Sequence, residues 1–185
     1  MNKVELNKIE HQYSVGDKCE PKQANITQDT IFLEDGEPVG FYISDIGEHS
    51  KSLKKFIDIA NAEFNSNRVP KSEMRRSSGL IDSHHEVKQY STIIGSVPAK
   101  ANMRRNTHRV SSVYGHKGAE TFIKAMELAC IESEKLIEKH LPNVYELQLS
   151  KIKEVPREWR FGSLFTSSIS NYNIAAPFHF DKANI

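Results

Sequence analysis

Apolar residues recur with a 3.6-residue period through the segment that follows Gly118, and acidic and basic residues fill the positions between them. The apolar members are Phe122, Ile123, Met126, Ala129, Cys130, Leu136, Ile137 and Leu141. This pattern predicts a long amphipathic helix with one apolar stripe. We expect it to close at Leu141-Pro142, because the residue before a proline disfavours helical geometry.

Two further elements are predicted upstream of this helix. Residues 30–34 and 38–43 are rich in β-branched and aromatic side chains and flank Asp35-Gly36, a pair suited to the positive φ angles of a hairpin turn. A second helix should begin after Ser50 or Ser52, either of which could cap it. Its apolar stripe has spacings of three and four and consists of Leu53, Phe56, Ile57, Ala60 and Phe64.

The remaining regular segments are short strand candidates. Residues 87–94 could form a strand that ends at Gly95, and residues 110–114 another. Three more candidates come late in the chain, at residues 145–152, 162–170 and 177–181, with Pro156 and residues 171–173 as separators. This order of elements predicts an α+β fold in which helices pack on one side of a largely antiparallel sheet.

Length and composition set broad limits. At 185 residues, with 38% hydrophobic and 26% charged residues and a formal net charge of +1, the chain fits a single globular domain, and its overall charge selects no partner. It contains no apolar run long enough for a signal peptide or a membrane span, so we expect a cytoplasmic protein without a membrane partner. Cys19 and Cys130 are then expected to be free thiols.

Positive charge is concentrated between Arg68 and Lys117. This segment has ten basic and three acidic residues, or seven net positive charges (ten minus three). The candidate nucleic-acid contacts in it are Arg75, Arg76, Arg104, Arg105 and Arg109, with Tyr90 and Tyr114 as stacking surfaces. A solvated loop region whose charges balance an acidic helix explains the same composition, so both interpretations stay open.

The chemistry-bearing motif is His179-Phe180-Asp181. A His and an Asp two residues apart on a strand point to the same face, so both can reach one divalent metal ion. Neutral imidazole and carboxylate are two of the three ligands of the facial triad of mononuclear iron oxygenases. That triad needs a second His, and no His follows Asp181 in this sequence.

The segment 159–184 resembles the start of the catalytic barrel of iron- and 2-oxoglutarate-dependent dioxygenases, and most of all the branch of J-binding-protein and ten-eleven-translocation-like nucleobase oxygenases with its bacteriophage members. In that branch a strand bearing Ser, Thr and Asn leads through a proline to His-x-Asp and then to an Asn, and Pro177, His179, Asp181 and Asn184 fit this order. The resemblance implies Fe(II) and 2-oxoglutarate as cofactors. It implies His179 and Asp181 as metal ligands and places Asn171 and Asn173 in the cosubstrate or substrate pocket.

The resemblance further implies hydroxylation of a DNA pyrimidine, at the methyl group of 5-methylcytosine or thymine. The fold would be an incomplete double-stranded β-helix (jelly roll), with residues 1–143 supporting the first barrel strands in residues 144–185. The family's distal His and 2-oxoglutarate-binding Arg are missing after Asp181, so we expect an N-terminal part that is inactive without a second half, which another polypeptide could supply. Upstream His84, His85, His108 or His116 could replace that ligand only in a rearranged topology. The alternatives are a catalytically dead DNA-binding or interaction module, or an oxygenase of a protein or small molecule.

Overall fold

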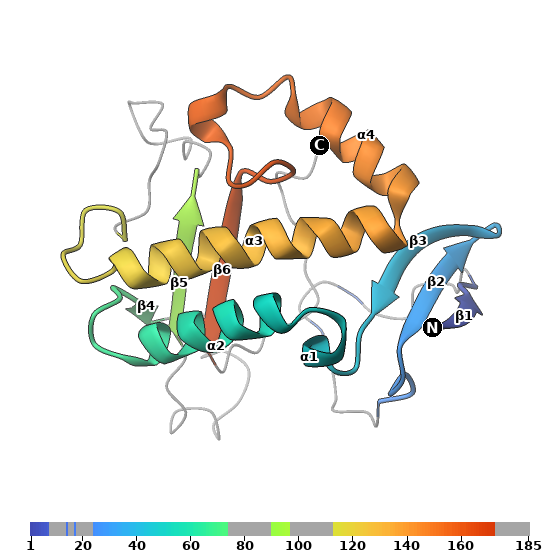
Figure 1. The fold of residues 1–185 in the computed structure, drawn as a ribbon, viewed down its shortest axis with the longest axis horizontal. Coiled ribbons are helices and arrows are strands. Elements are labelled where there is room, and N and C mark those ends of the chain that lie inside the picture. Colours follow the sequence, from blue (N-terminus) through green and yellow to red (C-terminus); the bar gives the residue numbers. More distant parts are fainter. Residues whose placement is uncertain (8–13, 15–16, 18–23, 74–89, 97–112, 173–185) are drawn as a thin grey trace.

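The structure is a computed structural model that describes residues 1–7, 14, 17, 24–73, 90–96 and 113–172. Within these residues the chain is a mixed α/β protein with two three-stranded sheets, and helices α2 and α3 extend side by side from one sheet to the other (Figure 1). Neither sheet closes into a barrel in this part of the chain. The jelly-roll barrel therefore stays a prediction.

The first sheet contains the predicted hairpin. Strands β2 (Thr30–Glu34) and β3 (Glu37–Tyr42) are antiparallel, and β1 (Asn2–Glu5) pairs with β2 in parallel. Asp35 and Gly36 have φ angles of 51° and 79°, the left-handed conformation that a two-residue hairpin turn requires. The hairpin is confirmed, whereas β1 was not predicted.

The helix predicted after Ser50 or Ser52 is also confirmed. It follows a one-turn helix α1 (Ile46–His49) and runs as α2 from Lys51 to Asn65. Ser50 is the capping residue, because its hydroxyl oxygen accepts a 3.1 Å hydrogen bond from the backbone N–H of Leu53. The apolar stripe of α2 faces α3.

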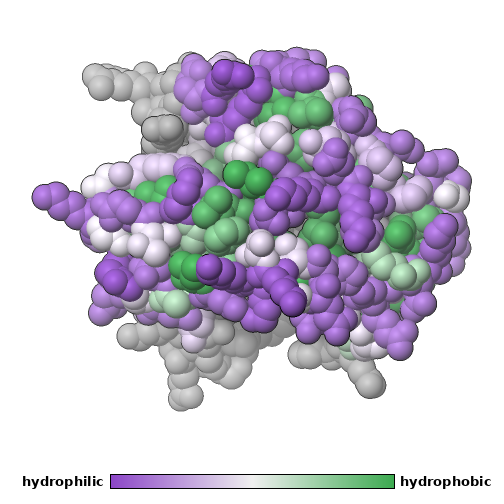
Figure 2. All heavy atoms as spheres, in the orientation of Figure 1, coloured by the Kyte–Doolittle hydropathy of each residue, from purple (hydrophilic) through white to green (hydrophobic). Residues whose placement is uncertain are grey.

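Helix α3 (Glu120–His140) is the long helix that the 3.6-residue period predicts. It contributes to three clusters of buried side chains: Phe122 and Ala125 pack with α2, Ala129 and Leu136 with α2 and the first sheet, and Cys130 with the second sheet. Hydrophilic residues cover most of the face of the molecule that Figure 2 shows, and hydrophobic side chains reach this face in patches. No helix in the described ranges is long and apolar enough to cross a membrane.

The second sheet is antiparallel throughout, in the order β4–β5–β6. Its strands are β4 (Ser72–Glu73), β5 (Tyr90–Gly95) and β6 (Ser167–Tyr172). Ile94 of β5 is buried against α3, so helices pack on one face of this antiparallel sheet, as predicted. Strand β5 confirms the described part of the strand expected at 87–94.

The prediction of a strand at residues 145–152 is wrong. These residues belong to helix α4 (Pro142–Ile152). The alternation of apolar and polar residues from Tyr145 to Leu149 suggested a strand, but Pro142 occupies the first turn of a helix, where its missing N–H costs no hydrogen bond. The same proline that ends α3 therefore begins the next helix.

Two strand boundaries also need correction. The strand expected at 162–170 begins only at Ser167, after a turn closed by an isolated bridge between Phe161 and Phe165, and it includes Asn171 and Tyr172, which were expected to separate strands. Of the strand expected at 110–114, the described residues Val113 and Tyr114 lie in a turn. The strand expected at 177–181 lies outside the described residues. A short 3₁₀ helix, η2 (Arg157–Trp159), joins α4 to the turn at Phe161.

Candidate functional site

Most predicted site residues lie outside the described part of the chain. These are the metal ligands His179 and Asp181, the pocket residue Asn173, and the candidate nucleic-acid contacts Arg75, Arg76, Arg104, Arg105 and Arg109. The structure describes Asn171, which lies on β6 just before the segment that bears the metal motif. The roles assigned to all of these residues stay predictions.

Asn171 faces Ser91 across the strand pair. The two residues are in register between β5 and β6, and the Ser91 hydroxyl donates a 2.9 Å hydrogen bond to the Asn171 side-chain carbonyl. Ile93 and Ile169 form the next in-register pair that points the same way, because side chains alternate along a strand. This face of the sheet therefore carries a polar pair beside an aliphatic pair.

The opposite face of the same sheet points toward the helices. Ser170 lies beside α3, with its hydroxyl 3.9 Å from the sulfur of Met126, and Ile94 is buried there. Tyr90 packs against the buried cluster that α2 and α3 share. The helices thus support one face of the sheet, and the Ser91–Asn171 pair lies on the other.

A buried carboxylate positions the start of β6. Glu134 of α3 accepts hydrogen bonds from the Ser163 backbone N–H (2.6 Å), the Ser163 hydroxyl (2.7 Å) and the Leu164 backbone N–H (3.0 Å). Gly162 precedes them with a φ of 71°, and a Cβ there would collide with the Glu134 carboxylate and lie 2.6 Å from the Cys130 sulfur. This turn is therefore tied to α3 immediately before β6 begins.

Cys130 lies behind the same turn as a free, buried thiol. Burial, together with the neighbouring Glu134 carboxylate, raises the pKa of Cys130 to about 12. A thiol with so high a pKa is almost entirely protonated at neutral pH and is a poor nucleophile. Cys130 confirms the expectation of a free thiol, whereas Cys19 lies outside the described residues.

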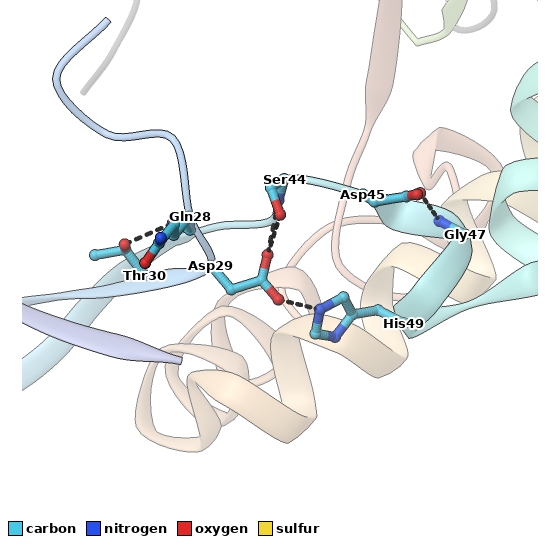
Figure 3. Close-up of polar contacts among 7 residues, drawn as sticks. All are labelled: Gln28, Asp29, Thr30, Ser44, Asp45, Gly47 and His49. Atoms are coloured by element: carbon cyan, nitrogen blue, oxygen red, sulfur yellow. Dashed lines mark hydrogen bonds and ion pairs between the residues drawn. The ribbon is translucent and has the colours of Figure 1, made fainter.

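A second polar cluster joins the first sheet to the helices and was not anticipated from the sequence. Asp29, just before β2, accepts a hydrogen bond of 2.8 Å from the Ser44 backbone N–H and one of 2.7 Å from its hydroxyl, and its other oxygen lies 2.5 Å from Nε2 of His49 (Figure 3). The two Ser44 hydrogen bonds and His49 lower the pKa of Asp29 to about 2. The residues are far apart in sequence, so no local pattern signals the cluster.

This arrangement does not activate a nucleophile. In a catalytic triad the imidazole lies between the serine and the carboxylate and takes the serine proton. Here the carboxylate of Asp29 lies between Ser44 and His49, and the Ser44 hydroxyl donates to it (Figure 3). The cluster is therefore a structural tie between β2, β3 and α1.

His140 packs beside this tie at the end of α3. Its ring centroid is 6.1 Å from that of His49 and 5.3 Å from that of Phe41. Its buried Nε2 has no hydrogen-bond partner among the described residues. Burial lowers the pKa of His140, and the positive charge of Lys139 lowers it further, so this imidazole is neutral at neutral pH.

The described residues contain no group of three or more His, Cys, Asp or Glu side chains arranged to hold a metal ion. His179 and Asp181 are not among them, so this finding leaves the predicted iron ligands untested. Comparison with protein families, with curated proteins and with solved structures gave no match to this chain.

Proposed function

We propose that this chain is part of an iron- and 2-oxoglutarate-dependent dioxygenase that hydroxylates the methyl group of a pyrimidine in DNA. The observation that carries the proposal is the His179-Phe180-Asp181 motif, which follows Pro177 a few residues beyond a strand that bears three Ser and one Asn. In this proposal the protein works in the cytoplasm, or in the host cytoplasm if it is encoded by a phage.

Three features of the described residues support the proposal. Strand β6 leads directly into the segment that bears the motif, and it pairs antiparallel with β5. Helices α2 and α3 back one face of this sheet, which leaves the Ser91–Asn171 pair on the other. A polar pair on that face could contact a chelating cosubstrate.

The chain's own residues have defined tasks in this mechanism. Fe(II), when bound, supplies the activation of oxygen that is coupled to the decarboxylation of 2-oxoglutarate. His179 must be neutral and Asp181 ionised to act as ligands, so metal binding should weaken as the pH falls and both become protonated. Two protein ligands are one fewer than the facial triad requires, so we expect weak iron binding and little turnover by these 185 residues alone.

Metal binding tests the proposal first. Titration of the protein with Fe(II) under anaerobic conditions, with 2-oxoglutarate present, should give binding that His179→Ala and Asp181→Ala each abolish. His116→Ala, in the turn before α3, is the matched control and should bind as the unmodified protein does. Equal binding by all three variants would refute the assignment of His179 and Asp181.

Product analysis tests the reaction. The protein is mixed with Fe(II), 2-oxoglutarate and DNA that contains thymine or 5-methylcytosine, alone and with a polypeptide that supplies the distal His and an Arg. We expect succinate and a hydroxymethylated base only in the complete mixture. Robust turnover without the added polypeptide would refute the need for a second half.

The alternative is a catalytically dead module that has kept the front of the fold and binds DNA or another protein. Such a module would bind DNA equally well with and without Fe(II), and it would yield no succinate in any mixture. An oxygenase of a protein or small molecule would produce succinate without modified DNA.

A further inference from the structure

A small cavity lies where the ends of β5 and β6 meet the end of α2. It has a volume of about 270 Å³, and its lining residues are Phe64, Asn65, Lys71, Tyr90 and Tyr172. Drug-sized ligands occupy cavities of about 300–1,000 Å³, so this one suits a smaller molecule. Tyr90 and Tyr172 are in-register neighbours on β5 and β6, and they point to the face of the sheet that the helices support.

The three aromatic rings favour a flat, ring-shaped ligand. Phe64 is buried and packs in the core, Tyr90 is half-buried, and Tyr172 is 45% exposed. The buried ring of Phe64 gives the cavity a fixed floor, and a ligand can reach the exposed ring of Tyr172 from solvent. Aromatic side chains with accessible faces are the surfaces on which unpaired nucleobases stack.

Lys71 adds positive charge to the aromatic walls. Its ammonium nitrogen is 5.2 Å from the centre of the Phe64 ring and 5.8 Å from that of the Tyr90 ring, and it donates a hydrogen bond to the Phe64 carbonyl. An ammonium group has three N–H donors, so this bond leaves capacity for an anionic ligand. The same charge disfavours a cationic ligand, such as a methylated ammonium group, that aromatic cages otherwise bind.

The described lining residues combine three rings, one ammonium and the amide of Asn65. A ring with an attached phosphate matches this set, because the base stacks on tyrosine, the phosphate pairs with Lys71, and the amide can hydrogen-bond to the edge of the base. In a duplex the bases are stacked on one another and their faces are not available. The cavity therefore fits one unpaired nucleotide.

We propose that the cavity formed by Lys71, Tyr90 and Tyr172 binds an unpaired nucleotide of a single-stranded nucleic acid. The site lies on the face of the sheet opposite Asn171, since Asn171 and Tyr172 are adjacent on one strand and point to opposite sides. The proposal does not rest on iron chemistry.

The test is fluorescence anisotropy of the full 185-residue chain with a labelled 12-nucleotide oligothymidine, with EDTA present so that no metal contributes. Tyr172→Leu removes the exposed ring and should weaken binding by about 5- to 150-fold, the effect of losing one base–aromatic stack. Tyr172→Phe keeps the ring and should bind as the unmodified protein does. Tyr42→Leu is the matched control, because Tyr42 is also a strand tyrosine, 38% exposed, but belongs to the first sheet.

The salt dependence of the affinity gives a second readout, which would not change if Lys71 had only a structural role. Lys71→Gln should reduce the slope of log affinity against log salt by about 0.7, the contribution of one phosphate contact on a single strand. Lys151→Gln, on the exposed end of α4, should leave the slope unchanged. Circular dichroism and thermal melting of each variant show that it is folded before its affinity is compared.

Each outcome of these measurements either supports or overturns the proposed site. Weaker binding by Tyr172→Leu and a smaller slope for Lys71→Gln, with the controls unchanged, support the proposal, and a parallel titration with oligouridine shows whether DNA or RNA is preferred. Unchanged affinity in folded Tyr172→Leu, or a duplex that binds as tightly as the single strand, would overturn it. Because EDTA is present throughout, failure here leaves the proposed oxygenase function standing, and failure of iron binding leaves this site standing.

Discussion

The Glu134 side chain hydrogen-bonds to the turn before β6. Glu134 is 6% exposed, and its carboxylate accepts three hydrogen bonds from Ser163 and Leu164. Hydrogen bonds to a charged acceptor are stronger than neutral ones, and a buried group left without its partner costs free energy. One side chain of α3 thus fixes where the last described strand begins.

We expect Glu134→Gln to lower the free energy of unfolding by about 2–3 kcal/mol, because the amide carries no charge and turns an N–H group toward the donors of the turn. Urea denaturation monitored by circular dichroism measures the change. Glu138→Gln, at an exposed position one turn further along α3, is the matched control and should change it by less than about 0.5 kcal/mol. Equal effects of the two substitutions would contradict this role of Glu134.

The Asp29 carboxylate makes stability depend on pH. Its pKa in the folded protein is about 2, below the ordinary value of 3.8, because Ser44 and His49 stabilise the ionised form. A lowered pKa contributes stability that is fully present above pH 3.8 and is lost as the pH falls toward 2. The unmodified protein should therefore lose stability across this window.

Asp29→Asn removes the ionisable group, so the difference in urea midpoint between this variant and the unmodified protein should shrink as the pH falls from 5 toward 2. Ser44→Ala removes only the hydroxyl donor and keeps the backbone N–H, so it should retain part of the pH dependence. A difference between Asp29→Asn and the unmodified protein that stays constant over this range would show that Asp29 does not titrate as its contacts indicate.

At the scale of whole elements, capping residues and prolines decide where helices begin and end, which the period of apolar residues leaves open. The apolar stripes of α2 and α3 predicted both helices, and their boundaries follow from Ser50 at one start and Pro142 after the other end. Periodicity alone failed after Pro142, because the short alternation of apolar and polar residues there predicted a strand and the residues form helix α4. Its first-turn proline was the signal that could have identified α4.

Ser50 and Ser52 were both candidate caps for α2, and only Ser50 accepts a hydrogen bond from the Leu53 N–H. We expect Ser50→Ala to lower the free energy of unfolding by about 1 kcal/mol, because a backbone donor in the first turn loses its partner. Ser52→Ala, at an exposed position inside the helix, should have no effect or a slight stabilising one. A larger loss from Ser52→Ala than from Ser50→Ala, measured by thermal melting, would contradict the cap assignment.

At the scale of the molecule, α3 is the element that the three core clusters of the described residues share. It connects the hairpin sheet, α2 and the β4–β5–β6 sheet, whose strands come from widely separated parts of the sequence. Gly95 lies where two of these parts meet, with a φ of 99° and with the backbone of Thr166 and Ser167 so close that a Cβ would collide with it. The pairing of β5 with β6 therefore requires glycine at this position.

We expect Gly95→Ala to lower the free energy of unfolding by about 2 kcal/mol or more, because both the positive φ angle and the steric collision oppose a side chain. Gly115→Ala is the matched control, since a Cβ at Gly115 would meet no atom within 4 Å. Urea denaturation of both variants measures the difference. Similar stability of the two would show that β5 and β6 can separate at this end without cost.

The sequence by itself determined the local elements whose signals lie within a few residues. The hairpin at Asp35-Gly36, the two amphipathic helices and the strand at Tyr90–Gly95 are all of this kind, because turn conformation, capping and periodicity act over short distances. The tertiary structure alone decided the pairing of β1 with β2, the Asp29–Ser44–His49 tie, the Glu134 turn and the cavity at Tyr172. Each depends on contacts between residues far apart in the chain, and the free energy of such contacts is set by packing that no local pattern encodes.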